Sequence, residues 1–230
     1  QSTIAQQEYD EGLRSYMMGV FNHMSTALLI TGITSFLLAP FLTPLMGTLW
    51  WFAIVLAPLA FVLVLSFGIH KISESTAKRL FYAYSIAMGA SLSSIFIIFT
   101  TTSIAKVFFI CSSTFAAASI YGYTTKRDLT SMSTFLVMGM IGLMIASIAN
   151  IFLASSMMAW IISIVGVLVF TAMTAYDSQN LKKEYLSNGE VYGLDSQEKS
   201  SIFGALTLYL NFVILFQYML ELFGNKDESE

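Results

Sequence analysis

Seven long hydrophobic runs dominate this sequence, and each is long enough to cross a bilayer as a helix. A hydrocarbon core of roughly 30 Å requires about 20 apolar residues in α-helical conformation. The runs lie at about 17–39, 48–69, 80–103, 105–123, 134–154, 157–178 and 202–223. Of the 230 residues, 56% are hydrophobic and only 11% are charged, which is unlike a soluble domain. We therefore predict an all-α membrane protein with seven transmembrane helices.

Two of the boundaries between runs are short. The third and fourth runs are separated by little more than the polar stretch 100–106, so one long span is the alternative to two. A merged run of more than 40 residues is too long for a single crossing, however, and must turn. The fifth and sixth runs meet at 154–156. We expect one membrane domain over 1–230, with a polar N-terminal arm at 1–16 and a polar tail at 224–230.

The distribution of Lys and Arg predicts the orientation of the chain. Cytoplasmic segments of membrane proteins carry an excess of these residues. If the N-terminus is cytoplasmic, nine of the eleven lie on that side, namely Arg14, Lys71, Lys78, Arg79, Lys126, Arg127, Lys182, Lys183 and Lys199. Lys106 and Lys226 lie on the other side. This pattern predicts a cytoplasmic N-terminus and a C-terminus outside.

The last run is not apolar all round. At 3.6 residues per turn, one stripe of this helix carries Gly204, Thr207, Asn211, Tyr218 and Glu221. The opposite side carries Phe212, Val213, Phe216, Leu220 and Phe223. Polar groups turned toward lipid would stay unpaired, so the stripe must face protein or water. We predict that this helix is central, with the other six around it. The alternative is ordinary helix packing by small and hydrogen-bonding residues.

Asp177 ends the sixth run, roughly 8 Å inward from Lys182 and Lys183 at 1.5 Å per residue. A carboxylate at that depth requires a partner or a water-filled pocket. It is either a cation site or proton-sensitive latch, or a helix-end residue paired with a nearby Lys or Arg. By the same measure Thr207 is about 12 Å deep and Asn211 about 18 Å deep. Thr207 is thus the better match in depth, and contact between Asp177 and Asn211 requires a kink or tilt.

Several classes of function are disfavoured. The net charge of −3 provides no basic surface for nucleic acid. His23 and His70 have no further ligands at a familiar metal-site spacing, so we expect neither a metal site nor a cofactor beyond transient calcium. The segment 89–92 (GASL) resembles the nucleophile segment of intramembrane serine proteases, but both histidines precede it. We expect no enzymatic activity.

Four segments together resemble the transmembrane Bax inhibitor motif family, and the resemblance covers nearly the whole chain. They are YMMGVFNHMSTALLITGITSFL, AYSIAMGASLSSIF, TAYDSQNLKK and GALTLYLNFVILFQYMLELFG. The resemblance implies a seven-helix bundle around the last helix, and the bacterial branch of the family. It implies a pH-sensitive calcium leak, suppression of cell death, or modulation of a membrane-bound AAA protease as possible functions.

In channel-like members of that family, two aspartates on the last two helices form a proton-sensitive latch. Asp177 matches the first aspartate, whereas Asn211 replaces the second with an amide. Thr207 occupies a position that is often acidic, and Glu221 one that is often Arg. Two nearby carboxylates share a proton, and an aspartate with an asparagine cannot. The resemblance therefore implies an altered latch in this chain.

Two functional hypotheses follow. The first is a cation leak or transport protein of the bacterial inner membrane, with Asp177, Asn211, Thr207 and Glu221 along the ion pathway. Lys71, Lys78 and Arg79 are the candidate counter-cations for Asp177. The second is a non-conducting regulatory protein that binds a membrane protease complex or acts in a stress pathway, with the segment 1–16 as its docking arm.

Overall fold

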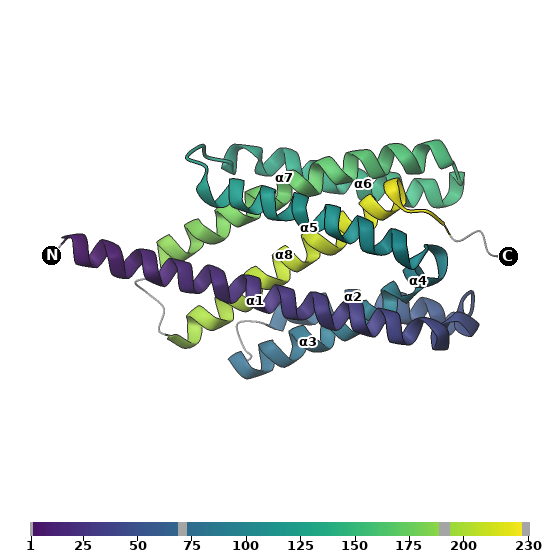
Figure 1. The fold of residues 1–230 in the computed structure, drawn as a ribbon, viewed down its shortest axis with the longest axis horizontal. Helices are drawn as coiled ribbons and strands as arrows, with labels where there is room; N and C mark the ends of the chain where they lie inside the picture. Colours follow the sequence, from purple (N-terminus) through teal and green to yellow (C-terminus); the bar gives the residue numbers. More distant parts are fainter. Residues whose placement is uncertain (1, 69–72, 189–193, 227–230) are drawn as a thin grey trace. The chain divides into compact units, whose positions relative to one another are not determined.

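The computed structural model describes residues 2–68, 73–188 and 194–226, and within these ranges the chain is almost entirely helical (Figure 1). The helices are α1 (Ser2–Leu42), α2 (Leu49–Gly68), α3 (Glu74–Ser91), α4 (Ile95–Ile98), α5 (Thr101–Thr124), α6 (Ser133–Leu153), α7 (Ser156–Asn188) and α8 (Leu194–Phe223). Short 3₁₀ turns η1 (Thr43–Leu45), η3 (Leu92–Ser94) and η4 (Thr130–Met132) connect some of them. The predicted all-α class is confirmed.

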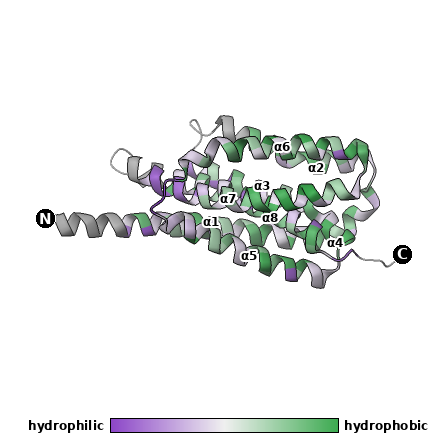
Figure 2. Cartoon of the chain, turned by 90° about the horizontal axis from the view of Figure 1, so that it is seen from above, coloured by the Kyte–Doolittle hydropathy of each residue, from purple (hydrophilic) through white to green (hydrophobic). Residues whose placement is uncertain are grey.

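Within the described ranges, six helical segments are long and apolar enough to cross a membrane. They are Glu11–Leu45, Glu74–Ile98, Thr101–Thr124, Thr130–Leu153, Ser156–Tyr185 and Glu198–Phe223. Figure 2 shows apolar residues along most of the length of the helices, and many of them are exposed. A helix of this kind is stable in lipid because its backbone groups are satisfied internally. The chain is therefore a multi-pass membrane protein whose apolar surface contacts the bilayer.

The ends of several helices differ from the predicted ends. Helix α1 already begins at Ser2, so residues expected to form a separate polar arm are helical. At the end of that stretch, Leu13 and Tyr16 are buried and continue the helical spacing of the buried Val20, so the packed face of α1 begins before the predicted span. Helix α7 continues past the predicted end at 178 to Asn188. The described apolar stretch of α2 is Leu49–Leu63, shorter than the other six.

The break between the third and fourth runs falls earlier than predicted, at Phe99 and Thr100. Phe99 adopts an extended conformation and pairs with Lys226 in an isolated β-bridge. Helix α5 then begins at Thr101. The two-run interpretation of 80–123 is therefore confirmed, and the single long span is wrong.

The chain forms two compact units. Unit 1 comprises Gln1–Thr100, Tyr185–Tyr209 and Lys226–Glu230, and unit 2 comprises Thr101–Glu184 and Leu210–Asn225. In unit 1, α1 and α2 both pack against α3. Tyr209 of α8 lies in the core of this unit, with its ring edge-on to Phe81 and Tyr84 at centroid distances of 5.9 and 5.8 Å. Its hydroxyl group shares a 2.6 Å hydrogen bond with the Thr31 hydroxyl.

In unit 2, α6 and α7 lie side by side and are joined by a tight turn (Figure 1). Ala154 is left-handed, with φ of 48°, and its amide donates to the Asn150 carbonyl. Ser155 caps α7, since its hydroxyl accepts from the Met158 amide at 3.3 Å. Helix α5 contacts α7 at Gly122, where a side chain would collide with the Ala175 carbonyl. The packing of unit 2 therefore depends on close approach of helix backbones.

Candidate functional site

Helices α7 and α8 bring Asp177 and Asn211 into direct contact within unit 2. The Asn211 Nδ2 atom donates a hydrogen bond of 2.6 Å to the Asp177 Oδ2 atom. Both residues are almost completely buried, with 7% of Asp177 and 5% of Asn211 exposed. Because the acceptor is a carboxylate oxygen, the amide must present its nitrogen rather than its oxygen at this contact. The pair is thus a carboxylate held by a neutral donor.

The prediction that Asp177 lies at the depth of Thr207 was wrong, because Asp177 contacts Asn211, one helical turn further along α8. The depth of Asp177 was measured from Lys182 and Lys183, on the assumption that they mark the membrane interface. In the structure both lysines bond to groups of the protein, Lys182 to the Tyr123 carbonyl and Lys183 to Asp128. Long lysine side chains reach several ångströms from their backbone, so they are poor markers of depth.

The predicted polar stripe on α8 is interrupted. Asn211 is buried, but Thr207 and Glu221 are exposed. The opposite side of α8 is also covered, because Phe212, Val213 and Leu220 are buried. Phe212 packs edge-on against two rings of α5, Phe108 and Phe115, at centroid distances of 5.7 and 5.4 Å. Asn211 thus follows the prediction that the stripe faces the protein, Thr207 and Glu221 do not lie in the interior, and neighbouring side chains cover the opposite side of α8 as well.

No cation is paired with Asp177 in the described ranges. The candidate Lys78 forms an ion pair of 3.4 Å with Glu198 in unit 1, and Arg79 is exposed. Lys71, like His70, lies outside the described residues. Lys183 pairs with Asp128. Among the described residues, the structure therefore shows no Lys or Arg that neutralises Asp177, and pairing with Lys71 stays untested.

Other hydroxyl groups beside Asp177 on α7 are occupied within their own helix. Thr174 donates to the Phe170 carbonyl and Ser178 donates to the Thr174 carbonyl, each at 2.8 Å. Such bonds satisfy the donor without a second helix. Asn211 is thus the neighbour that sets the hydrogen bonding of the carboxylate.

The family model described as inhibitor of apoptosis-promoting Bax1 (Bax1-I) matches residues 13–228. The chain belongs to the Bax1-I family. The expected family resemblance is thereby confirmed. As a Bax1-I member it is 44% identical to an uncharacterized protein of Rickettsia prowazekii, over 98% of this chain and 95% of that protein. It is 41% identical to the inner membrane protein YbhL of Escherichia coli K12, over 94% of this chain and 93% of YbhL.

A further Bax1-I relative, an uncharacterized protein of Caulobacter vibrioides, is 36% identical over 97% of this chain and 94% of its own length. In each of these three comparisons the match covers more than nine tenths of both chains. In the part of this Bax1-I protein that the structure describes, no three His, Cys, Asp or Glu residues are grouped so as to hold a metal ion.

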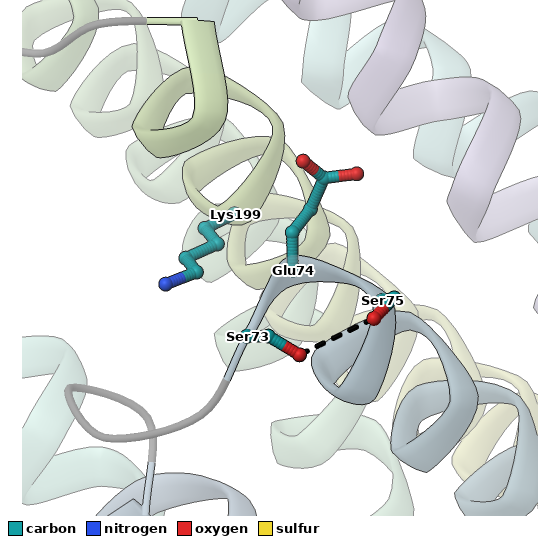
Figure 3. A pocket seen from close by; sticks show the side chains of 4 residues that line it. All are labelled: Ser73, Glu74, Ser75 and Lys199. Atoms are coloured by element: carbon teal, nitrogen blue, oxygen red, sulfur yellow. Dashed lines mark hydrogen bonds between the residues drawn. The ribbon is translucent and has the colours of Figure 1, made fainter.

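A pocket of about 330 Å³ lies at the start of α3, lined by Ser73, Glu74, Ser75 and Lys199 (Figure 3). The Ser73 and Ser75 hydroxyls pair with each other at 3.2 Å. Ser73 also caps α3 by accepting from the Thr76 amide. Figure 3 shows the side chains of Glu74 and Lys199 reaching in different directions. The two serine hydroxyls of this pocket therefore serve the start of α3, and the pocket does not include the Asp177–Asn211 pair.

Sequence reasoning missed two residues of the site region. Gln179, two residues after Asp177, is buried and bonds to the segment that follows α5. Gly122 permits the close contact between α5 and α7 next to Asp177. The signal for Gln179 was a long amide at the end of an apolar run, which is costly to bury without partners. Nothing in the sequence distinguished Gly122 from the other small residues of the hydrophobic runs.

Proposed function

We propose that this Bax1-I protein is a cation leak or transport protein, with calcium as the favoured ion and Asp177 as the gate-side carboxylate. The observation that supports the proposal is the buried Asp177, whose hydrogen-bond partner is a neutral amide rather than a cation. A carboxylate buried without a counter-charge is costly, and such residues in membrane helices commonly mark ion pathways. A passing cation would supply the missing positive charge.

The observed pair corresponds to the closed state in this proposal. Calcium binds oxygen ligands, and both carboxylates and amide carbonyls serve. Asn211 now directs its nitrogen at Asp177, so its oxygen is not available to an ion beside that carboxylate. Opening requires the 2.6 Å bond to break and the amide to turn. The step is therefore a local exchange of a hydrogen bond for an ion contact.

The amide also changes how this gate responds to pH. In the two-aspartate latch implied by the family resemblance, the two acids share a proton because they cannot both ionise cheaply. The Asn211 amide does not titrate, so it has no carboxyl proton to share with Asp177. We therefore propose a shallower pH response in this chain, and Asn211→Asp should steepen it.

A flux assay in reconstituted vesicles tests the proposal. Calcium entry is followed from pH 5 to 8 for the wild type, Asp177→Ala and Asn211→Asp. Asp128→Ala is the matched control, because Asp128 is an exposed acid of the same unit. We expect entry above that of empty vesicles, loss in Asp177→Ala, and no change in Asp128→Ala. Entry equal to that of empty vesicles, or unaltered in Asp177→Ala, would falsify the proposal.

The proposal includes a seven-span bundle around α8, with α2 as the additional crossing. The span window of α8 is 61% buried, whereas those of the other five candidates are 11–33% buried. This difference supports an inner position for α8. The excess of Lys and Arg supports a cytoplasmic N-terminus, and the likeness to the inner membrane protein YbhL supports the inner membrane. Thiol labelling of single cysteines placed at Ser15 and Asn225 tests the two sides.

The length of α1 favours a second candidate function. At 41 residues it is about twice as long as a bilayer crossing requires. Its first turns are therefore free to reach beyond the membrane and dock on another membrane protein, such as a protease complex. Crosslinking in native membranes, with and without residues 2–10, tests this role. A partner retained after the deletion rejects α1 as the docking element.

A further inference from the structure

The segment between α5 and η4, Thr125–Leu129, is held against α7 by a single buried side chain. The Gln179 Oε1 atom accepts from the Leu129 amide, and its Nε2 atom donates to the Arg127 carbonyl, each at 2.8 Å. Only 6% of Gln179 is exposed. One side-chain amide thus satisfies a donor and an acceptor of the segment, as a backbone neighbour in a sheet would.

Two lysines extend this attachment by one helical turn. Lys182 donates to the Tyr123 carbonyl at 3.0 Å and lies 4.8 Å from the centroid of the Tyr123 ring. Lys183 bonds to Asp128 and, at 2.8 Å, to the Thr130 hydroxyl. The Lys183–Asp128 pair is exposed, and exposed ion pairs contribute little. The buried Gln179 bonds are therefore the main attachment.

Gln179 and Asp177 hold opposite sides of the same helix. Residues that are two positions apart in an α-helix, as Asp177 and Gln179 are, lie about 200° apart around its axis. Asp177 accordingly meets α8 through Asn211, whereas Gln179 meets the Thr125–Leu129 segment. The contact of Gly122 with the Ala175 backbone fixes the spacing of α5 and α7 just before this point. The end of α7 is thus fixed from two sides within unit 2.

We infer that Gln179 is a positioning residue that sets the place of the Asp177 carboxylate against Asn211. A rotation or displacement of α7 would carry Asp177 away from Asn211, and the two Gln179 bonds oppose such a movement. With α7 held in place, the carboxylate stays within reach of the Asn211 amide, and loss of the Gln179 bonds should loosen this contact. The consequence for ion flow rests on the proposed function, but the positioning itself does not.

Infrared spectroscopy measures the positioning without any transport. The carboxylate band of Asp177 is identified by its loss in Asp177→Asn, and Asn211→Leu shows its position when the amide donor is absent. In Gln179→Leu we expect the band to move toward the Asn211→Leu position. Asn180→Leu is the matched control, since Asn180 is an exposed amide on the next residue, and its band should match the wild type. An unmoved band in Gln179→Leu overturns the inference.

Hydrogen exchange and flux complete the test. Loss of two buried hydrogen bonds should speed exchange at the Leu129 amide by about tenfold or more. If the wild type conducts calcium, Gln179→Leu should leak faster, and the added leak should vanish in Asp177→Ala. Faster exchange with an unmoved Asp177 band means that Gln179 only holds the segment, and rejects positioning. If the wild type conducts no calcium, the proposed function is rejected. The position of the Asp177 carboxylate band in Gln179→Leu still tests whether Gln179 positions Asp177.

A milder variant covers the case in which Gln179→Leu does not fold. Gln179→Glu keeps an oxygen for the Leu129 amide but loses the donor to the Arg127 carbonyl. We expect a band shift in the same direction and smaller than that of Gln179→Leu. No shift in a folded Gln179→Glu protein with fast exchange at 127–129 also overturns the inference.

Discussion

Replacing Asn211 with Leu removes the hydrogen bond to Asp177 and puts an apolar side chain of similar size in place of the amide on α8. The Asp177 carboxylate then stays 7% exposed with its donor gone. A buried acceptor that loses its partner incurs the full cost of desolvation. We therefore expect Asn211→Leu to destabilise unit 2, although Leu itself is the better membrane residue.

The size of the effect follows from the type of bond. Hydrogen bonds between membrane helices average about 0.6 kcal/mol in double-mutant cycles and reach about 1.7. Hydrogen bonds to charged groups contribute about 1.5–3 kcal/mol. Since the bond is 2.6 Å long, buried, and accepted by a carboxylate, we expect a coupling near the top of the membrane range, about 1.5 kcal/mol.

The measurement is a double-mutant cycle in detergent micelles. Unfolding free energies are determined for the wild type, Asn211→Leu, Asp177→Leu and the double variant at pH 8. Asp177→Leu removes the buried charge, so the double variant should be more stable than Asn211→Leu alone. A coupling energy below about 0.5 kcal/mol, or equal costs for Asn211→Leu with and without Asp177, would show that the pair does not hold α7 to α8.

Three further perturbations test separate parts of the structure. Gly122→Ala should destabilise the protein by about 1–3 kcal/mol, because its methyl group collides with the α7 backbone; Gly142→Ala, with open space around it, should be neutral or slightly stabilising in the same thermal assay. Thr31→Val should cost about 1–2 kcal/mol, because it leaves the buried tyrosine hydroxyl without its 2.6 Å partner; Thr26→Val, whose hydroxyl bonds only within its own helix, should cost less than about 0.5. Hydrogen bonds from Lys183 and then from Thr130 lower the pKa of Asp128, so Asp128→Asn should change melting temperature by a constant amount from pH 8 to 5.

The sign of the last effect follows from linkage. A lowered folded-state pKa means that the contribution of Asp128 is present above its unfolded-state value of about 3.8 and is lost as the pH falls through the lower folded-state value. The difference in melting temperature should therefore shrink only below about pH 4. A difference that disappears between pH 7 and 5 contradicts this assignment.

Equal melting temperatures for Gly122→Ala and Gly142→Ala, or for the two threonine variants, contradict the packing described for those positions.

Periodicity within one segment was enough to predict most helices, because hydrophobic length and helical spacing are local properties. It also singled out Asp177 and Asn211 as polar groups that apolar helices bury at a cost. Their contact was not predictable, because it depends on how α7 and α8 pack. Lys182 and Lys183 misled the depth estimate for the same reason, since their partners lie on and after α5.

The structure also shows contacts that link residues far apart in sequence. Tyr209 and Thr31 are separated by 178 positions, yet they share a buried hydrogen bond. No spacing rule relates a threonine on the first helix to a tyrosine on the last. The position of Gln179 suggested only that its amide needs partners, and its actual partners were not predictable, since they are backbone groups of a polar segment with no motif.

The turn between α6 and α7 bears on how the protein enters the bilayer. Ala154 and Ser155 are the two residues between α6 and α7, and the Asn150 side chain accepts from the Ser155 amide at 3.1 Å. Two residues are far too few to cross roughly 30 Å of hydrocarbon, so the C-terminal end of α6 and the N-terminal end of α7 must lie on the same side of the bilayer. The two helices therefore cross the membrane in opposite directions as an antiparallel hairpin, and an insertion that changed the orientation of one would have to change that of the other.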